Sequence, residues 1–214
     1  MQDLLLKIYK ALFKSFGPQN WWPAKTKFEV IAGAILTQNT AWSNVEKAIS
    51  SLRSAGVLSQ KKLRVMPVNR LAKLIKPAGY YNIKAERLKN FVNFLFREYQ
   101  GSIKKMFAIP AGRLRQELLK INGVGNETAD SIILYAAEKP VFVVDAYTRR
   151  ILLRHQIIPQ EYKYGQIQSI FEKNLPKDHL LYNEFHALIV KLGKDYCRKK
   201  PQCKLCPLAG LIHK

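Results

Sequence analysis

The sequence predicts an all-α fold, and three features of the chain support this class. Apolar residues recur at the 3.6-residue period of an amphipathic helix along much of the 214-residue chain. Two such patterns flank the tight turn Gly123-Val124-Gly125, as in a helical hairpin. The one strand-like segment, the apolar run at residues 141–144, is short and isolated. No internal repeat or low-complexity linker is present.

The helical elements follow one another with clear breaks between them. Helices are expected at residues 2–16, 27–37, 42–52, 112–137 (the hairpin), 146–154, 165–174 and 180–196, with further helices between 61 and 105. The first ends at Gly17-Pro18, and Gly79 takes the position that follows a helix C-terminus. Residues 61–105 carry twelve Lys or Arg and only two acidic residues, which indicates a largely solvated basic face.

Composition limits the partners and the location of the protein. Lys and Arg number 36 against 15 acidic residues, so the formal net charge is +21. Such a charge favours a polyanionic partner: nucleic acid first, an anionic membrane second. No apolar run approaches the ~20 residues of a membrane span. The N-terminus lacks a signal-peptide pattern. We therefore expect a cytoplasmic protein in which clustered cysteines indicate a metal rather than disulfides.

The hairpin turn is a candidate phosphate-binding site. Glycines at positions 123 and 125 allow positive φ angles and close approach of another molecule. The helix expected to start at Asn126 or Glu127 would direct its first backbone N–H groups outward. On a basic protein the anion would be a nucleic-acid phosphate, bound by residues 123–126 and Thr128. An ordinary helical hairpin closed by glycines explains the same residues.

Asp145 follows the apolar run and precedes a new helix. It has the position of a helix N-cap, and capping alone would explain an aspartate there. The combined pattern LxxINGVGxxTA followed by VVDAYTRRI, however, resembles the helix-hairpin-helix and Gly/Pro…Asp signature of the endonuclease III superfamily of DNA glycosylases. In that family the aspartate at this position is catalytic, which implies the same role for Asp145.

The resemblance also implies an architecture and a partner. Residues 25–135 would form a central helical bundle that ends in the hairpin. Residues 1–24 and 136–214 would form a second helical lobe with the C-terminal cysteine loop, and a DNA-binding cleft would lie between the two. The partner would be double-stranded DNA with a damaged base, bound by a monomer in base excision repair.

The hairpin departs from the family's strand-cleaving members at one position. Those members use a lysine two residues after the second glycine to form a Schiff base at C1′ of the sugar. Glu127 stands at that position here, and a carboxylate cannot form an imine. The sequence therefore predicts a glycosylase without AP lyase activity. Lys120, on the other side of the turn, is not a natural substitute.

Three tryptophans and a glutamine are candidates for the base pocket. The chain resembles the 3-methyladenine DNA glycosylase branch of the superfamily in several segments. These are WWP, LTQNT, the glutamate in the hairpin and GYYNIKAERL. A flipped base needs aromatic plates, and Trp21, Trp22 and Trp42 can supply them, with Trp42 and Trp21 favoured for the pocket and Trp22 for the core. The resemblance also implies that Gln38 lies beside the opened base-pair space, and Glu127 is a further candidate for the substrate pocket.

Other activities are compatible with the same sequence. The alternatives are a mismatch thymine or uracil glycosylase, an endonuclease III-like glycosylase/AP lyase, and a DNA-binding module without catalysis. Asp145 at the family's position argues against the last.

The cysteines Cys197, Cys203 and Cys206 lie within ten residues of one another. They resemble the [4Fe–4S] loop of endonuclease III, which has a fourth cysteine. Here His213 would complete the ligand set, or the cluster would have a fourth ligand from outside the protein, or the cluster would be lost. An iron–sulfur cluster is favoured and zinc is the alternative. Arg198, Lys199 and Lys200 in this loop would contact DNA. The remaining histidines, His155, His179 and His186, are expected to be structural or solvated.

Overall fold

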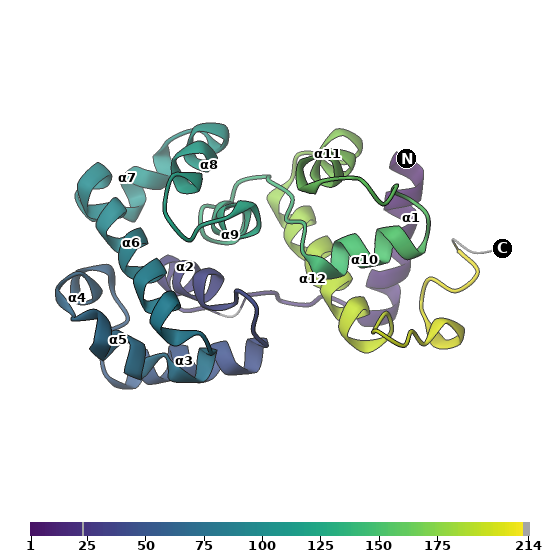
Figure 1. Ribbon diagram of the computed structural model, residues 1–214. Coiled ribbons are helices and arrows are strands. Elements are labelled where there is room, and N and C mark those ends of the chain that lie inside the picture. Colours follow the sequence, from purple (N-terminus) through teal and green to yellow (C-terminus); the bar gives the residue numbers. More distant parts are fainter. Residues whose placement is uncertain (23, 212–214) are drawn as a thin grey trace. The chain divides into compact units, whose positions relative to one another are not determined.

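The computed structural model describes residues 1–22 and 24–211, and in these residues it consists of helices, turns and loops without a strand (Figure 1). The predicted all-α class is confirmed. The chain divides into two compact units. We call residues 24–137 the hairpin unit, and residues 1–22 with 138–211 the aspartate unit. Among the described helices, none combines the length and the apolar character that crossing a bilayer would require.

The hairpin unit is built around one helix that is buried along nearly its whole length. Its helices are α2 (Lys27–Leu36), α3 (Trp42–Ser54), α4 (Gln60–Val65), α5 (Val68–Leu74), η1 (Lys76–Ala78), α6 (Tyr81–Tyr99), α7 (Ile103–Ala108), α8 (Ala111–Leu119), α9 (Asn126–Ser131) and η2 (Ile132–Ala136). Every residue from Phe28 to Leu36 in α2 is buried, because this helix is apolar on nearly all sides. It packs against α3, α6, α9 and η2. The hairpin is thereby attached to the core of its unit.

The second hairpin helix ends within one residue of its expected end at residue 137. After α9 the backbone continues as the π-helical segment η2, which ends at Ala136, four residues before Pro140. Glu138 has a φ of 55°, in the left-handed region. The chain therefore turns out of the helix before the proline is reached.

Two lysines of the basic stretch bind backbone carbonyl groups, and one of them, Lys84, is buried. Lys84 is 1% exposed, and its ammonium donates to the carbonyl oxygens of Leu36 (2.8 Å) and Ala78 (2.7 Å). Burial lowers the pKa of Lys84 to about 8, and the charge of Arg87 acts in the same direction. Lys89 donates to three carbonyl groups at the end of α4 and just after it. Both cations bind helix ends within the protein, and the interpretation of the stretch as a largely solvated face is wrong for the buried Lys84.

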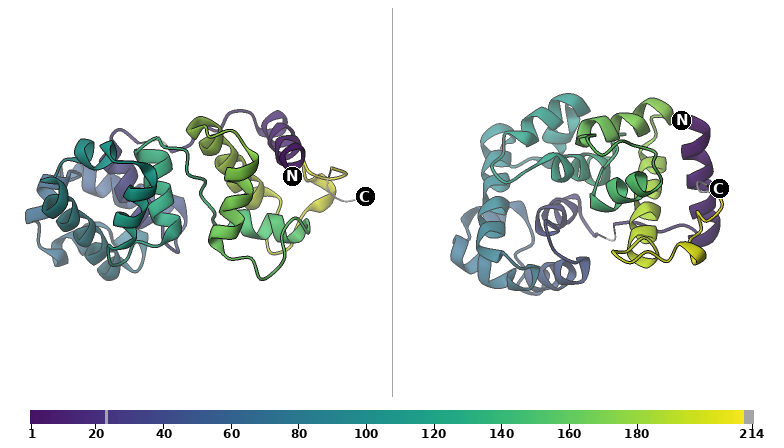
Figure 2. Two further views of the ribbon diagram at one scale, coloured as in Figure 1. Left: turned by 90° about the horizontal axis from the view of Figure 1, so that it is seen from above. Right: turned by 45° about the vertical axis from the view of Figure 1, so that its right-hand side comes forward.

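Two helices of the aspartate unit, α10 (Ala146–Arg154) and α12 (His179–Asp195), pack closely against each other. The other helices of this unit are α1 (Gln2–Phe16), α11 (Tyr164–Asn174) and η3 (Cys203–Leu205). α12 contacts both α1 and α10, which can be followed in Figure 2. A Cβ at Gly193 would lie 2.3 Å from Cδ1 of Tyr147, so only glycine permits this approach of α10 to α12. Arg150 fixes the contact by donating to the carbonyl oxygens of Gly193 and Cys197.

The apolar run at residues 141–144 is buried but is not a strand. Side chains of α11 satisfy part of its backbone. The Phe142 N–H donates to Glu172 (2.9 Å), and its carbonyl oxygen accepts from Gln168 (2.7 Å). The N–H of Val144 donates to the hydroxyl of Tyr164 (3.3 Å). This run leads directly to Asp145.

Candidate active site and DNA-binding hairpin

The two glycines of the hairpin turn differ in backbone conformation and in the space around them. Gly123 has a φ of 92°, and a Cβ there would lie 2.2 Å from Cγ of Arg87. Gly125 is the N-cap of α9 with a φ of −94°, so Gly123 alone of the two uses the positive φ that a glycine permits. A Cβ at Gly125 would meet no atom within 4 Å. No side chain caps this helix terminus, which leaves room for a ligand to approach its backbone.

Gln38 connects the turn to the end of α2. Its side-chain amide donates to the carbonyl oxygen of Gly123 (2.9 Å) and to the hydroxyl of Thr128 (2.8 Å). Its amide oxygen accepts from Arg87. The amide that was expected beside the flipped base thus holds the hairpin turn and the first turn of α9 together.

An ion pair with a buried carboxylate joins the two hairpin helices. Arg115 of α8 donates from Nε and Nη2 to both carboxylate oxygens of Asp130 in α9, at 2.7 and 3.1 Å. Asp130 is fully buried, and Nη2 of Arg115 also donates to Asn126. Arg115 and Asp130 are not among the residues that the sequence predicts for the site. Their separation of fifteen residues across a turn gives no periodic signal.

Asp145 begins α10 and uses one carboxylate oxygen as a cap. Oδ1 accepts from the backbone N–H of Thr148 (2.7 Å) and from its hydroxyl (2.8 Å). Oδ2 lies 3.7 Å from Nε2 of His186 in α12. The Asp145 side chain is 13% exposed. Capping therefore leaves the second oxygen, which carries part of the negative charge, turned toward His186.

His186 lies in a mostly aromatic environment. It is 5% exposed, and its ring centroid is 6.5 Å from those of Trp21 and Phe142. Burial lowers the pKa of His186, and the charge of Asp145 opposes this shift. The sequence predicted no functional role for His186, because its neighbours in the chain give no signal of a contact with Asp145.

The candidate pocket tryptophans belong to both units. Trp21 and Trp22 meet edge to face at 6.3 Å in the aspartate unit, and Trp21 also contacts His186. Trp22 has a φ of 71°, a strained value for a bulky residue. The ammonium of Lys194 lies 5.6 Å from the Trp21 ring centroid. Trp42 begins α3 in the hairpin unit and donates from Nε1 to Glu46. Glu127 is in the first turn of α9.

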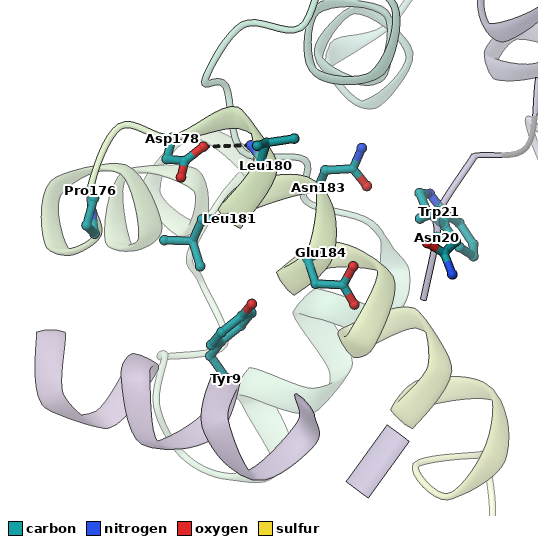
Figure 3. A pocket seen from close by; sticks show the side chains of 9 residues that line it. All are labelled: Tyr9, Asn20, Trp21, Pro176, Asp178, Leu180, Leu181, Asn183 and Glu184. Carbon is teal, nitrogen blue, oxygen red and sulfur yellow. Dashed lines mark hydrogen bonds between the residues drawn. The ribbon is translucent and has the colours of Figure 1, made fainter. Parts of the chain in front are cut away.

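A hollow of about 530 Å³ opens beside Trp21 (Figure 3). Trp21 and Asn20 lie beside α12, which contributes Asn183 and Glu184, and Tyr9 approaches from α1. The lining also contains the carboxylate of Asp178. Two carboxylates on an otherwise basic protein make this hollow a poor site for a DNA phosphate.

The cysteine loop is attached to α10 by arginines. Arg154 donates to Sγ of Cys197 (3.2 Å) and to the carbonyl oxygens of Arg198 and Lys199. The three cysteines form no disulfide. Burial is the main cause that raises the pKa of Cys206, and the two neighbouring thiols act in the same direction. Within residues 1–22 and 24–211, no group of three or more potential ligands is placed to hold a metal ion. His213 lies outside the described residues.

The family profile described as HhH-GPD superfamily base excision DNA repair protein matches residues 32–177, more than half of the chain. The chain therefore belongs to the HhH-GPD superfamily of base excision DNA repair proteins. The hairpin and Asp145 both lie inside the matched residues.

Individual relatives agree with this assignment. A protein of Methanocaldococcus jannaschii whose name assigns it provisionally to DNA repair glycosylases is 51% identical over 208 residues, covering 96% of this chain and 94% of the relative. Endonuclease III of Thermotoga maritima is 31% identical over a match that covers 84% of this chain and 78% of the relative. The crystal structure of H. pylori 3-methyladenine DNA glycosylase (MagIII) bound to 1,N6-ethenoadenine matches with 31% identity and a TM-score of 0.78, covering 89% of this chain and 97% of that one.

Proposed function

We propose that this chain is a monofunctional DNA glycosylase that flips alkylated purines, of the 3-methyladenine type, out of DNA and hydrolyses their glycosidic bonds. A DNA glycosylase of base excision repair is the broader function that the family and relatives support. The observation that carries the proposal is the carboxylate of Asp145, which follows the hairpin in the chain, is fixed by Thr148 through one oxygen and leaves the other available.

Asp145 would stabilise positive charge on the sugar. Cleavage of the bond between base and C1′ passes through a transition state with oxocarbenium character. A carboxylate about 4 Å from that cation contributes on the order of 4 kcal/mol at an effective dielectric constant of about 20. Oδ2 would also orient the attacking water, because Oδ1 already accepts two hydrogen bonds from Thr148.

The proposed base class follows from leaving-group chemistry and the tryptophans. N3- or N7-alkylation makes a purine cationic, which improves it as a leaving group and as a partner for an electron-rich indole. Trp21 and Trp22 lie in the same unit as Asp145. The relative of known structure that is named a 3-methyladenine DNA glycosylase supports this choice.

The released bases would test the proposed substrate. The purified protein is incubated with methylated duplex DNA and, in parallel, with duplexes carrying thymine or uracil mismatches, and the free bases are identified. Release of methylated purines alone is expected. If only thymine or uracil is released from mismatches, the substrate is a mismatched pyrimidine and not an alkylated purine. If no base is released from any duplex, the result favours a DNA-binding protein without catalysis.

Borohydride trapping should detect no covalent complex with DNA. Glu127 stands where lyases of the family carry the Schiff-base lysine, and a carboxylate forms no imine. The products should be alkali-labile abasic sites in an intact strand. Glu127→Lys restores an amine at this position and is the positive control. A trapped adduct with the wild-type protein would show that another lysine forms the imine.

DNA affinity should fall steeply with salt. The logarithm of the association constant falls with the logarithm of salt concentration by about 0.9 per neutralised phosphate. Lys199 and Lys200 are exposed, so replacing both with alanine should reduce this slope and weaken binding equally for all sequences. Lys191→Ala is the control, because Lys191 is paired with Asp195 (2.9 Å). A slope near zero in the wild-type protein would contradict backbone-dominated binding.

Trp21→Ala and Trp42→Ala should each reduce excision of 3-methyladenine and preserve affinity for an abasic-site analogue. Stacking of a base on an aromatic ring is worth roughly 1–3 kcal/mol. A tryptophan that only fills the core would instead cost about 3–5 kcal/mol of folding stability. Excision, analogue binding and melting temperature are measured together. If excision, analogue binding and melting temperature all fall together, the ring belongs to the core. This is the result expected for Trp22→Ala.

The metal of the cysteine loop remains a prediction. The three described cysteines form no metal-binding group with other described residues, so no step of the mechanism is assigned to a metal. Iron, sulfide and zinc analysis of the purified protein would distinguish a [4Fe–4S] cluster from zinc.

A further inference from the structure

We propose that His186 is a positioning residue for Asp145: its Nε2–H donates a hydrogen bond to Oδ2 and holds the carboxylate in its reactive orientation. This inference rests on the proposed glycosylase function of Asp145. It concerns a contact wholly within the aspartate unit.

The two oxygens of Asp145 have different neighbours. Oδ1 is fixed by the N–H and hydroxyl of Thr148, which is itself fully buried. The neighbour of Oδ2 is Nε2 of His186, at 3.7 Å. This distance exceeds that of a formed hydrogen bond. Catalytic hydrogen bonds are often long in the absence of substrate, and the proposed hydrogen bond requires this contact to shorten in the complex with DNA. A donor on this side would stop the carboxylate from rotating about its bond to Cβ.

The position of His186 is fixed by the packing of its helix. Gly193 lies two helical turns further along α12 and lets Tyr147 of α10 approach closely. Arg150 of α10 binds the carbonyl oxygens of Gly193 and Cys197. The same register that brings these groups together places His186 beside Asp145. The contact therefore follows from the rigid pairing of α10 with α12.

The surroundings of His186 favour the neutral imidazole. Trp21 and Phe142 flank it, and the residue is 5% exposed. Burial lowers the pKa of His186. A neutral donor is useful here, because it orients Asp145 without cancelling the negative charge that stabilises the sugar cation. An imidazolium in the same position would weaken that stabilisation.

The test compares two substitutions at His186. His186→Gln places an amide Nε2 donor close to the imidazole Nε2, whereas His186→Ala removes the donor. Single-turnover excision from methylated duplex, affinity for an abasic-site analogue and melting temperature are measured for both. His186→Ala should lower the excision rate by about ten- to a hundred-fold, the range for a hydrogen bond to a charged group. His186→Gln should restore most of the rate, and affinity should stay within about threefold of wild type for both variants.

A double substitution tests whether His186 acts through Asp145. In the Asp145→Asn background, His186→Ala should lower the rate by less than about threefold, because the effects of residues that act as a unit are not additive. His179→Gln, at the start of the same helix, is the matched control and should leave the rate unchanged.

Three outcomes would overturn the inference. They are a wild-type excision rate for His186→Ala, full additivity with Asp145→Asn, and a failure of His186→Gln to recover the rate when its melting temperature matches that of wild type. Failure of the proposed function is a different result, in which the wild-type protein itself releases no base.

Discussion

Asp145→Asn should abolish most base excision and leave the fold intact. The substitution removes the negative charge that would stabilise the sugar cation and orient water, and positioned acid–base groups contribute about 10²–10⁴-fold in rate. Asparagine is as good an N-cap as aspartate, and its amide oxygen can still accept from the N–H of Thr148. The single-turnover rate on methylated duplex should therefore fall by about this factor, with melting temperature and DNA affinity close to wild type.

A second substitution separates the two roles of the carboxylate. Asp145→Ala removes the charge and the cap together, so it should lose the same activity and in addition about 1 kcal/mol of stability. If Asp145→Asn excised at the wild-type rate and only Asp145→Ala differed in stability, Asp145 would be a helix cap and no more. The comparison works because Oδ1 alone makes the capping contacts.

Arg115→Met should be the most destabilising substitution proposed for the hairpin. It removes the bidentate partner of a carboxylate that is fully buried, and breaking such a pair typically costs about 3–5 kcal/mol. Arg115 is itself 28% exposed, so we expect the lower end, about 3 kcal/mol. The melting temperature should fall by roughly 6–12 °C, using the usual conversion for a chain of this length.

Arg113→Met on the same helix is the matched control. Arg113 is 70% exposed and pairs with Glu117 one turn further along, a contact worth at most about 0.5 kcal/mol. Arginine and methionine have similar helix propensities, so this contribution cancels between the two variants. Equal melting temperatures for the two would mean that the ion pair with Asp130 contributes nothing to the hairpin.

Local patterns in the sequence predicted the helices, the glycine turn and the start of α10 at Asp145. These depend on residues within one or two helical turns of each other, where periodicity and capping preferences are informative. Gln38 and Gly123 are 85 residues apart, and the amide that joins them could not be placed from either segment alone. The contact of His186 with Asp145 likewise depends on how α10 and α12 pack.

Buried lysines illustrate a second limit of sequence reasoning. A run of basic residues favours a solvated face on composition alone, yet Lys84 is enclosed and donates to two backbone carbonyl groups. Helix ends with unsatisfied carbonyl groups can accept an ammonium, but which lysine reaches them is decided by tertiary structure. Charge content predicted a polyanionic partner without identifying the residues that would bind it.

The run at residues 141–144 has a consequence for the local stability of the site. Phe142 and Val144 are held by side chains of α11 rather than by a strand ladder. When α11 opens, these backbone groups lose their partners at the same moment, so we expect the run and α11 to open together, with similar protection against hydrogen exchange. The segment that carries the chain into Asp145 therefore takes its protection against solvent exchange from a helix that follows it in the sequence.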